Sequence, residues 1–215
     1  MAILKLYGGK LTTCTRRVGT VLHELKVPFE LIEVDLFKGE QKTPEYLEKQ
    51  PFGQVPYIDD NGFILYESRA ICRYVAAKHP ESGLIPAEPK ANALFEQAAA
   101  AEVANFDPSA SKAGLEYFKQ KYFGMTPDQA LVDTELAALE KKLDAYEVIL
   151  SRHRYVAGDT LTLADLFHLP YAWLVTLGGS DIMTRRPNVA RWYQELTSRP
   201  SWLAFVDGAK TTKTY

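Results

Sequence analysis

The pattern of apolar residues changes near residue 80, and this change limits the folds that the chain can adopt. Before it, short apolar stretches bounded by turn residues predict strands that alternate with helices; they cover residues 3–7, 29–34, 55–58 and 63–66. The segment from His79 to Pro89 then holds three prolines and one glycine, through which a helix cannot continue. Beyond it, only helical spacing is found. We therefore predict an α/β domain over 1–80, a linker over 81–90 and an all-helical domain over 91–215.

The connections between the predicted strands define the first domain. Val18, Val21 and Leu22 recur at helical spacing between the first two strands, and a crossover helix favours a parallel pair. Residues 59–62, Asp-Asp-Asn-Gly, form a turn that makes the last two strands antiparallel. A mixed sheet of four strands with three helices fits the thioredoxin-like architecture.

The second domain is expected to be a helical bundle. One apolar seam with alternating spacings of four and three predicts a long core helix; its members are Val132, Leu136, Leu139, Leu143, Tyr146 and Leu150. Thr162 and Asp165 have the spacing of a reciprocal N-terminal cap and predict another buried helix behind them. The region 91–122 is rich in helix formers, but Asp107-Pro108 predicts a bend or break within it.

Composition and charge exclude several classes of protein. Of the 215 residues 47% are apolar, which is enough for a sizeable core, and the formal net charge is −2. No basic block is present, which argues against nucleic acid or an acidic membrane surface as a partner; we interpret Arg185-Arg186 as a solvated helix end. The sequence has neither a signal peptide nor an apolar run of the roughly 18 residues that a membrane span needs, so a cytoplasmic location is expected.

The cysteines and histidines indicate neither disulfides nor a metal site. Cys14 and Cys72 are too few for a disulfide framework, and both fall in predicted helices, which favours reduced thiols. Cys72 is interpreted as a small buried apolar residue. The four histidines are scattered along the chain, so we expect no metal.

Two short motifs point to a site for a small anionic peptide. Gln54-Val55-Pro56 precedes a strand, and a cis bond before Pro56 would turn the backbone of Val55 outward to pair with an extended peptide. Ser68 is predicted to be the N-cap of a helix whose free N–H groups suit a carboxylate. Glu67 beside it could hold an ammonium group. Together these groups suit the α-amino-acid end of a peptide.

These motifs, the Pro-rich linker and the capped helix at Thr162 together resemble the cytosolic glutathione transferases over essentially the whole chain. The stretches 50–56 (Gln-Pro-Phe-Gly-Gln-Val-Pro) and 65–74 (Leu-Tyr-Glu-Ser-Arg-Ala-Ile-Cys-Arg-Tyr) are similar to those of the plant phi class and its fungal relatives. The resemblance implies an enzyme that adds the thiolate of its co-substrate, glutathione, to hydrophobic electrophiles. It also implies a cytoplasmic homodimer.

The resemblance places the thiol-activating residue at Thr12. Phi enzymes use a serine four residues past a Tyr-Gly pair and five before an arginine, and Tyr7-Gly8 and Arg17 give these spacings for Thr12. Threonine keeps the hydroxyl, but its methyl restricts χ1 and crowds the sulfur. Lowering a thiol pKa by roughly two units needs about 2.7 kcal/mol, and one charge-assisted hydrogen bond supplies about 1.5–3 kcal/mol. Thr13 and Cys14 remain alternatives for this role.

The resemblance also implies the remaining contacts. Gln41 and Lys42 would meet the glycine carboxylate of glutathione; the cysteinyl backbone would meet Gln54, Val55 and Pro56, and the γ-glutamyl end would meet Glu67 and Ser68. Leu11 and three aromatic residues would line the electrophile site between the domains, although each is also a candidate for the core; the three are Phe106, Phe118 and Tyr122. Phe52 would insert into the partner subunit of a homodimer, or instead fold back onto its own domain.

Two other functions remain open beside conjugation. A protein that binds glutathione and carries apolar ligands with little turnover would explain a threonine at position 12. A thiol transferase that acts through Cys14 would instead form a mixed disulfide with glutathione.

Overall fold

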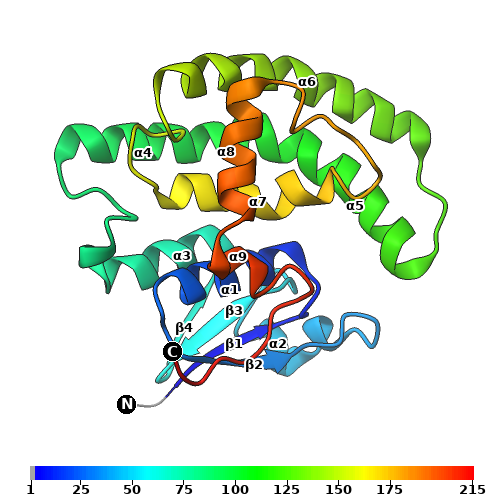
Figure 1. Ribbon diagram of the computed structural model, residues 1–215. Helices are drawn as coiled ribbons and strands as arrows, with labels where there is room; N and C mark the ends of the chain where they lie inside the picture. The colour runs from blue at the N-terminus through cyan, green and yellow to red at the C-terminus, as the bar shows by residue number, and fades with distance from the viewer. Residues whose placement is uncertain (1–2) are drawn as a thin grey trace. The chain divides into compact units, whose positions relative to one another are not determined.

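The computed structural model describes residues 3–215 and divides into two compact units (Figure 1). The first unit contains the residues up to Ser82 together with Arg199–Tyr215, and the second contains Gly83–Ser198. All four strands of the sheet belong to the first unit, and the second is helical, as the change of pattern near residue 80 predicts. No helix among the described residues is long and apolar enough to cross a membrane.

The first unit is built on a mixed sheet of four strands. The strands are β1 (Leu4–Gly8), β2 (Phe29–Glu33), β3 (Tyr57–Asp60) and β4 (Phe63–Tyr66). Their order is β2-β1-β3-β4, with β1 and β2 parallel and the other two pairs antiparallel. The predicted pairing directions and the thioredoxin-like architecture are therefore confirmed.

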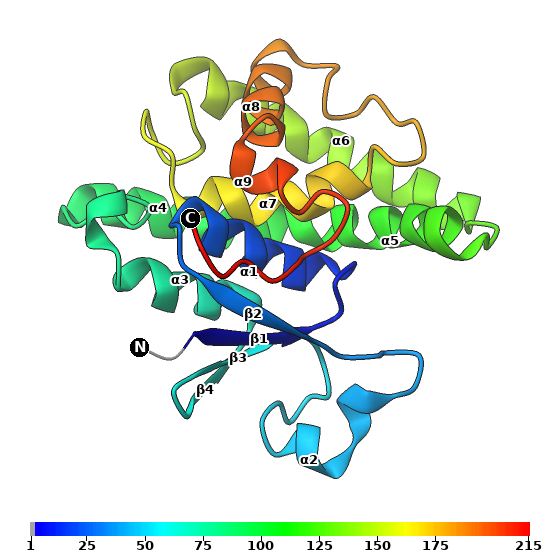
Figure 2. The ribbon, with the colours of Figure 1, turned by 60° about the horizontal axis from the view of Figure 1, so that its bottom comes forward.

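Helices cover both faces of this sheet (Figure 2). The helical elements of this unit are α1 (Thr13–Glu24), η1 (Glu40–Lys42), α2 (Pro44–Leu47), α3 (Ser68–Ala77), η2 (Pro80–Ser82) and α9 (Pro200–Leu203). Leu6 and Ile58 pair across the sheet and are fully buried. Because side chains alternate along a strand, both lie on the face opposite to that of Tyr7 and Tyr57. On the other face the rings of Tyr7 and Tyr57 stack at 4.4 Å, and Tyr46 of α2 packs edge-on against Tyr57 at 5.1 Å.

The hairpin between β3 and β4 is tighter than predicted. Its loop consists of Asn61 and Gly62 alone, with φ angles of 57° and 90°. Positive φ at both positions is what a two-residue hairpin turn requires, and Asn-Gly is the pair that adopts it most readily. The predicted turn over 59–62 was wrong by two residues, because Asp59 and Asp60 belong to β3.

The end of the chain belongs to the first unit, not to the helical domain in which we placed it. The backbones of Phe29 and Thr212 exchange hydrogen bonds of 2.8 and 3.0 Å, and Phe205 packs on Phe29 at 5.9 Å. Arg199 Nε donates to the carboxylate of Glu24 at 3.1 Å. These contacts return residues 199–215 to the sheet and to α1.

The second unit contains five α-helices and a π-helical turn. They are α4 (Pro89–Ala101), the π-helical turn η3 (Glu102–Phe106), α5 (Asp107–Phe123), α6 (Gln129–Arg152), α7 (Leu163–Leu174) and α8 (Pro187–Thr197). The break predicted at Asp107-Pro108 is present: Pro108 lies in the first turn of α5, directly after η3. Because proline has no N–H to donate, the regular helical ladder is interrupted there.

The seam predicted for α6 forms part of the core, and the cap predicted for α7 is present. Every seam residue except the half-buried Leu136 is buried. The carboxylate of Asp165 accepts the backbone N–H of Thr162 at 3.0 Å and the indole N–H of Trp192 at 2.9 Å. Burial raises the pKa of Asp165, while these hydrogen bonds oppose that rise. The cap therefore also ties α7 to α8.

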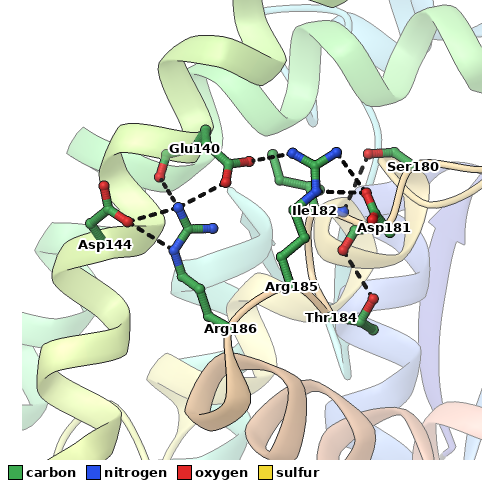
Figure 3. Close-up of polar contacts among 8 residues, drawn as sticks. All are labelled: Glu140, Asp144, Ser180, Asp181, Ile182, Thr184, Arg185 and Arg186. Carbon is green, nitrogen blue, oxygen red and sulfur yellow. Dashed lines mark hydrogen bonds and ion pairs between the residues drawn. The ribbon is translucent and has the colours of Figure 1, made fainter.

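Arg186 fixes the start of α8 to α6 (Figure 3). Its side chain, only 13% exposed, lies 2.7 Å from the carboxylate of Asp144 and 2.8 Å from that of Glu140, and it also donates to the Glu140 carbonyl at 3.0 Å. Arg185 beside it is 52% exposed and bridges Glu140 and Asp181. The interpretation of both arginines as a solvated helix end was wrong for Arg186.

We predict that Arg186→Met lowers the free energy of unfolding by about 1–2 kcal/mol, because it removes several partly buried hydrogen bonds. Arg185→Met removes the same charge from an exposed side chain, so its unfolding curve should match the wild type. Urea denaturation followed by tryptophan fluorescence measures both variants. Equal losses in the two would show that α8 does not depend on the Arg186 contacts.

Candidate functional site

The register of the sheet brings three loops to one edge. Tyr7 near the end of β1 pairs with Tyr57 at the start of β3, and Tyr57 pairs with Tyr66 at the end of β4. Gly8 also pairs with Glu33, so β2 ends at this edge as well. The segments that follow β1, precede β3 and follow β4 therefore meet there. These segments carry the predicted peptide-binding and thiol-activating residues.

Thr12 lies at the N-terminus of α1 and is half-buried. Its backbone is extended, at φ −70° and ψ 139°, and its carbonyl accepts the N–H of Arg16 at 3.0 Å. The Thr12 hydroxyl does not cap the helix. It donates to the carbonyl of Gly9 at 2.9 Å and lies 2.6 Å from the hydroxyl of Thr15.

Gly9 leaves room for the methyl group that distinguishes Thr12 from a serine. A Cβ added at Gly9 would lie 3.0 Å from Cγ2 of Thr12, a distance shorter than ordinary van der Waals contact. The methyl therefore occupies space that a larger residue at position 9 would fill. Because χ1 of threonine is restricted, this packing also fixes where the hydroxyl points.

The other two candidates for thiol activation have different surroundings. Thr13 is buried, whereas Cys14 is partly exposed and its Sγ lies 3.4 Å from a guanidinium nitrogen of Arg17. Cys72 is fully buried, and burial raises the pKa of its thiol to about 12. The interpretation of Cys72 as a small buried residue is confirmed.

Arg17 links the starts of α1 and α3. It is fully buried, and its guanidinium donates to the hydroxyl oxygen of Ser68 at 3.0 Å. Because this donor occupies the Ser68 oxygen, the proton of the hydroxyl is left to point toward another acceptor.

The N-cap of α3 is Glu67, so the assignment of the cap to Ser68 was wrong by one residue. Glu67 adopts φ 68° and ψ 107°, a conformation that costs a non-glycine residue of order 1–3 kcal/mol. Its side chain is exposed, whereas Ser68 is buried. Strain of this kind at a candidate site is consistent with a functional constraint on the backbone.

The loop before β3 is held by Tyr46 of α2, whose hydroxyl donates to the carbonyl of Gln54 at 2.8 Å. Burial raises the pKa of Tyr46, so this donor stays protonated. The peptide bond between Val55 and Pro56 is cis. Among the described residues, nothing is hydrogen-bonded to the backbone N–H or C=O of Val55. The backbone groups of Val55 are therefore available to a ligand.

Gln41 and Lys42 lie in η1, against the same loop. The ammonium of Lys42 donates to the carbonyl of Phe52 at 3.1 Å. Gly53 permits this approach, since a Cβ added there would lie 2.7 Å from the Lys42 ammonium. The amide oxygen of Gln41 is buried and has no hydrogen-bond partner within the described part of the chain. Phe52 itself is 63% exposed, and its ring approaches Tyr66 at 6.0 Å.

The residues predicted for the hydrophobic site fall into different environments. Leu11 is partly exposed and packs against Gly208, where an added Cβ would lie 3.3 Å from its side chain. Phe118 and Tyr122 are half-buried near the end of α5, with their rings 4.7 Å apart. Phe106 is fully buried, and its ring packs against Tyr146 and His168 at 6.0 and 4.8 Å. We therefore assign Phe106 to the helical core and withdraw it from the substrate site.

Four residues of this region escaped sequence reasoning. Gly9, Thr15, Arg17 and Tyr46 support the candidate residues without matching any peptide-binding motif. Arg17 was used only to count spacing; its burial and its hydrogen bond to Ser68 were not predicted. No signal in the sequence marks the contact of Tyr46 with Gln54. No group of three or more potential metal ligands is found over residues 3–215.

Comparison with known proteins identifies the family. The model of the glutathione S-transferase N-terminal domain matches residues 2–77, and that of the C-terminal domain matches residues 106–200. Glutathione S-transferase hmp2 of Hypomyces subiculosus is 43% identical over 207 residues, which span 94% of this chain and 96% of hmp2.

Solved structures of plant enzymes are similar as well. Glutathione transferase F2 from Populus trichocarpa has a TM-score of 0.88 at 38% identity and covers 95% of this chain and 97% of its own. Glutathione S-transferase I from maize was solved in complex with an atrazine glutathione conjugate. It has a TM-score of 0.88 at 32% identity and covers 96% of this chain and 97% of its own. The chain belongs to the glutathione S-transferase family, and the predicted resemblance to the phi class is confirmed.

The two cysteines should differ sharply in reactivity. Cys14 is partly exposed, whereas Cys72 is fully buried and its high thiol pKa leaves almost no thiolate. We expect iodoacetamide to modify the native protein at Cys14 alone, and urea to expose Cys72. Mass spectrometry of the wild type, Cys14→Ser and Cys72→Ser measures this. Rapid labelling of Cys72 in the native state would contradict the burial described here.

Proposed function

We propose that this protein conjugates the glutathione thiolate to hydrophobic electrophiles, with Thr12 as the group that activates the thiol. The observation that carries the proposal is the convergence of Thr12, Val55 and Ser68 on one edge of the sheet. Membership of the glutathione S-transferase family supports the activity, and the maize relative was solved with a glutathione conjugate bound. We propose a cytoplasmic location by the same relationship, and a reaction that needs no metal.

Glutathione has a carboxylate at its glycine end and both a carboxylate and an ammonium at its γ-glutamyl end, and the loops at this edge of the sheet carry polar groups for each. The side-chain oxygen of Gln41 has no hydrogen-bond partner among the described residues, and a flip of this amide would place its NH₂ donors at that position. The NH₂ group of Gln41 and the ammonium of Lys42 would then bind the glycine carboxylate. The Ser68 hydroxyl would donate to the γ-glutamyl carboxylate, and Glu67 would accept from the ammonium.

The middle of glutathione would extend along the loop that contains the cis bond between Val55 and Pro56, the cis-proline loop. The free backbone N–H and C=O of Val55 would pair with the cysteinyl residue in the manner of an added strand. Gln54 and Pro56 flank this position, and the bond from Tyr46 to Gln54 keeps the loop in place. The cysteinyl sulfur would then lie beside the N-terminus of α1.

Thr12 stabilises the thiolate when its hydroxyl turns from the Gly9 carbonyl and donates its hydrogen bond to the sulfur, with the proton still bound to the oxygen. A hydrogen bond to a charged acceptor contributes about 1.5–3 kcal/mol, and the N-terminus of α1 adds up to about 1 kcal/mol. Together these match the roughly 2.7 kcal/mol for a thiol pKa lower by two units. With a chlorinated dinitrobenzene, the thiolate forms a C–S bond, chloride leaves with the electron pair of the C–Cl bond, and the thiol proton goes to water.

We predict that Thr12→Val lowers the turnover of chlorodinitrobenzene at neutral pH by at least tenfold, because the thiolate loses its hydrogen-bond donor. Thr12→Ser keeps the hydroxyl and should retain turnover. Steady-state kinetics measure the loss, and calorimetric titration with glutathione checks that every variant still binds the peptide.

Two outcomes would reverse the assignment of Thr12. If turnover is unchanged in Thr12→Val and abolished in Cys14→Ser, then Cys14 carries the chemistry as in a thiol transferase. If the wild type binds glutathione but turns over no electrophile, a ligand-binding protein is the better description. The hydrogen bond of Thr12 to Gly9 in this structure is the feature that favours this second reading.

We also propose a homodimer in which Phe52 inserts into the partner subunit. The ring is 63% exposed and lies in a loop held by Lys42 and Gly53. An aromatic side chain on a rigid loop is suited to anchor an interface.

Phe52→Ser should therefore weaken the dimer by at least tenfold, since the mutation removes the ring that would be buried in the partner subunit. Analytical ultracentrifugation over a range of protein concentrations measures the dissociation constant. Phe37→Ser is the matched control, because Phe37 is 82% exposed in a different loop of the same unit. A monomeric wild type, or a dimer equally tight in Phe52→Ser, would exclude this role.

A further inference from the structure

Thr15 lies behind the candidate catalytic group, where no substrate contact has been assigned. It is fully buried, in the first turn of α1. Its Oγ1 is 2.6 Å from Oγ1 of Thr12. Thr12 donates its one hydroxyl proton to the carbonyl of Gly9, which cannot itself donate. The proton shared by the two hydroxyls is therefore that of Thr15, so Thr15 donates and Thr12 accepts.

The end of β1 holds the Thr15 hydroxyl in this position. A Cβ added at Gly8 would lie 2.3 Å from the Oγ1 atom of Thr15 and 3.0 Å from its methyl group. Real Cβ atoms do not approach other atoms so closely, so only glycine at position 8 permits this placement. The Thr15 side chain thus packs directly on the backbone of Gly8, and its hydroxyl has little freedom to turn.

We propose that Thr15 is a positioning residue for the thiol-activating step: it donates to Thr12 Oγ1 and thereby directs the proton of Thr12 toward the sulfur. This inference rests on the proposed role of Thr12. It adds a second hydroxyl that does not touch glutathione and acts only through the first.

The physical reason is a competition for one proton. The Thr12 hydroxyl can donate to the Gly9 carbonyl, to Thr15 or to a bound thiolate. Since Thr15 is itself a donor to Thr12, it is not available as an acceptor. The choice is then between a neutral carbonyl and a charged sulfur, and hydrogen bonds to charged acceptors are roughly twice as strong. The bond from Thr15 also polarises the Thr12 hydroxyl, which strengthens its donation further.

The test measures the pKa of the thiol of bound glutathione, from the ultraviolet absorbance of the thiolate as a function of pH. We expect Thr15→Val, which has nearly the same shape but no hydroxyl, to raise this pKa by about half a unit. The value of kcat then falls about threefold at pH values below the pKa and approaches that of the wild type above it. The KM for glutathione is expected to stay unchanged, because Thr15 makes no contact with the peptide.

Thr15→Ser and Thr20→Val are the matched controls. Thr15→Ser keeps the donor hydroxyl and should keep the wild-type pKa. Thr20 is buried on the same helix, and its hydroxyl has no hydrogen-bond partner among residues 3–215, so Thr20→Val removes a hydroxyl without touching the site. If Thr15→Val does not fold, Thr15→Ala provides the same comparison with a smaller side chain.

The outcomes separate this inference from the proposed function. A wild-type thiol pKa in Thr15→Val, or an equal shift in Thr15→Ser, would overturn the role of Thr15. A shift in Thr12→Val without one in Thr15→Val would leave the proposed function standing and remove only this inference. If neither variant shifts the pKa, Thr12 itself does not activate the thiol.

Discussion

The antiparallel pairing of β3 with β1 is the constraint on which the candidate site depends. The register places Tyr57 opposite Tyr7 and Ile58 opposite Leu6. Because side chains alternate along a strand, a slip by one residue would move Tyr57 to the face of α1 and α3 and Ile58 to the face of Tyr46. The stacked pair of Tyr7 and Tyr57 opposes that slip. The same register sets the cis-proline loop beside the loop that follows β1, so packing on the far face of the sheet fixes the geometry of the site.

Helices α6 and α8 provide hydrogen-bond partners for polar groups at each other's ends. The carboxylate of Glu147 in α6 accepts hydrogen bonds from the backbone N–H groups of Asn188 and Val189 at the start of α8, at 3.0 and 3.1 Å. Arg191 in α8 in turn donates to the carbonyl of Leu150, near the end of α6, at 3.1 Å. Helix ends are costly when buried without partners. The two helices therefore stabilise each other's ends, while the seam of α6 supplies the apolar contact.

The fold could be predicted from the sequence because its signals are local. A crossover helix, an Asn-Gly turn and a Pro-rich segment fix strand directions and the change to helices without knowledge of the other residues. The position of Thr12 followed from its spacing to Tyr7 and Arg17. Its rotamer did not follow, because the rotamer depends on Gly9 and Thr15 in three dimensions.

Other features could not be predicted because they depend on long-range contacts. Arg185 and Arg186 are indistinguishable in sequence, and both reach Glu140 of α6, yet only Arg186 is largely buried there. Phe106 had the same aromatic character as Phe118, but Phe106 lies at the end of the π-helical turn and is fully buried in the core. The return of residues 199–215 to the sheet joins positions roughly 180 apart, and no periodicity reports such a pairing.

That return also determines when the first unit can be completed during synthesis. The backbone of Thr212 pairs with Phe29 at the outer edge of β2, which would otherwise present unpaired N–H and C=O groups to other chains. The ribosome synthesises the helical unit before it synthesises this segment. The edge of β2 therefore stays unpaired while more than a hundred residues are added. The first unit is thus the first to be made and the last to be closed.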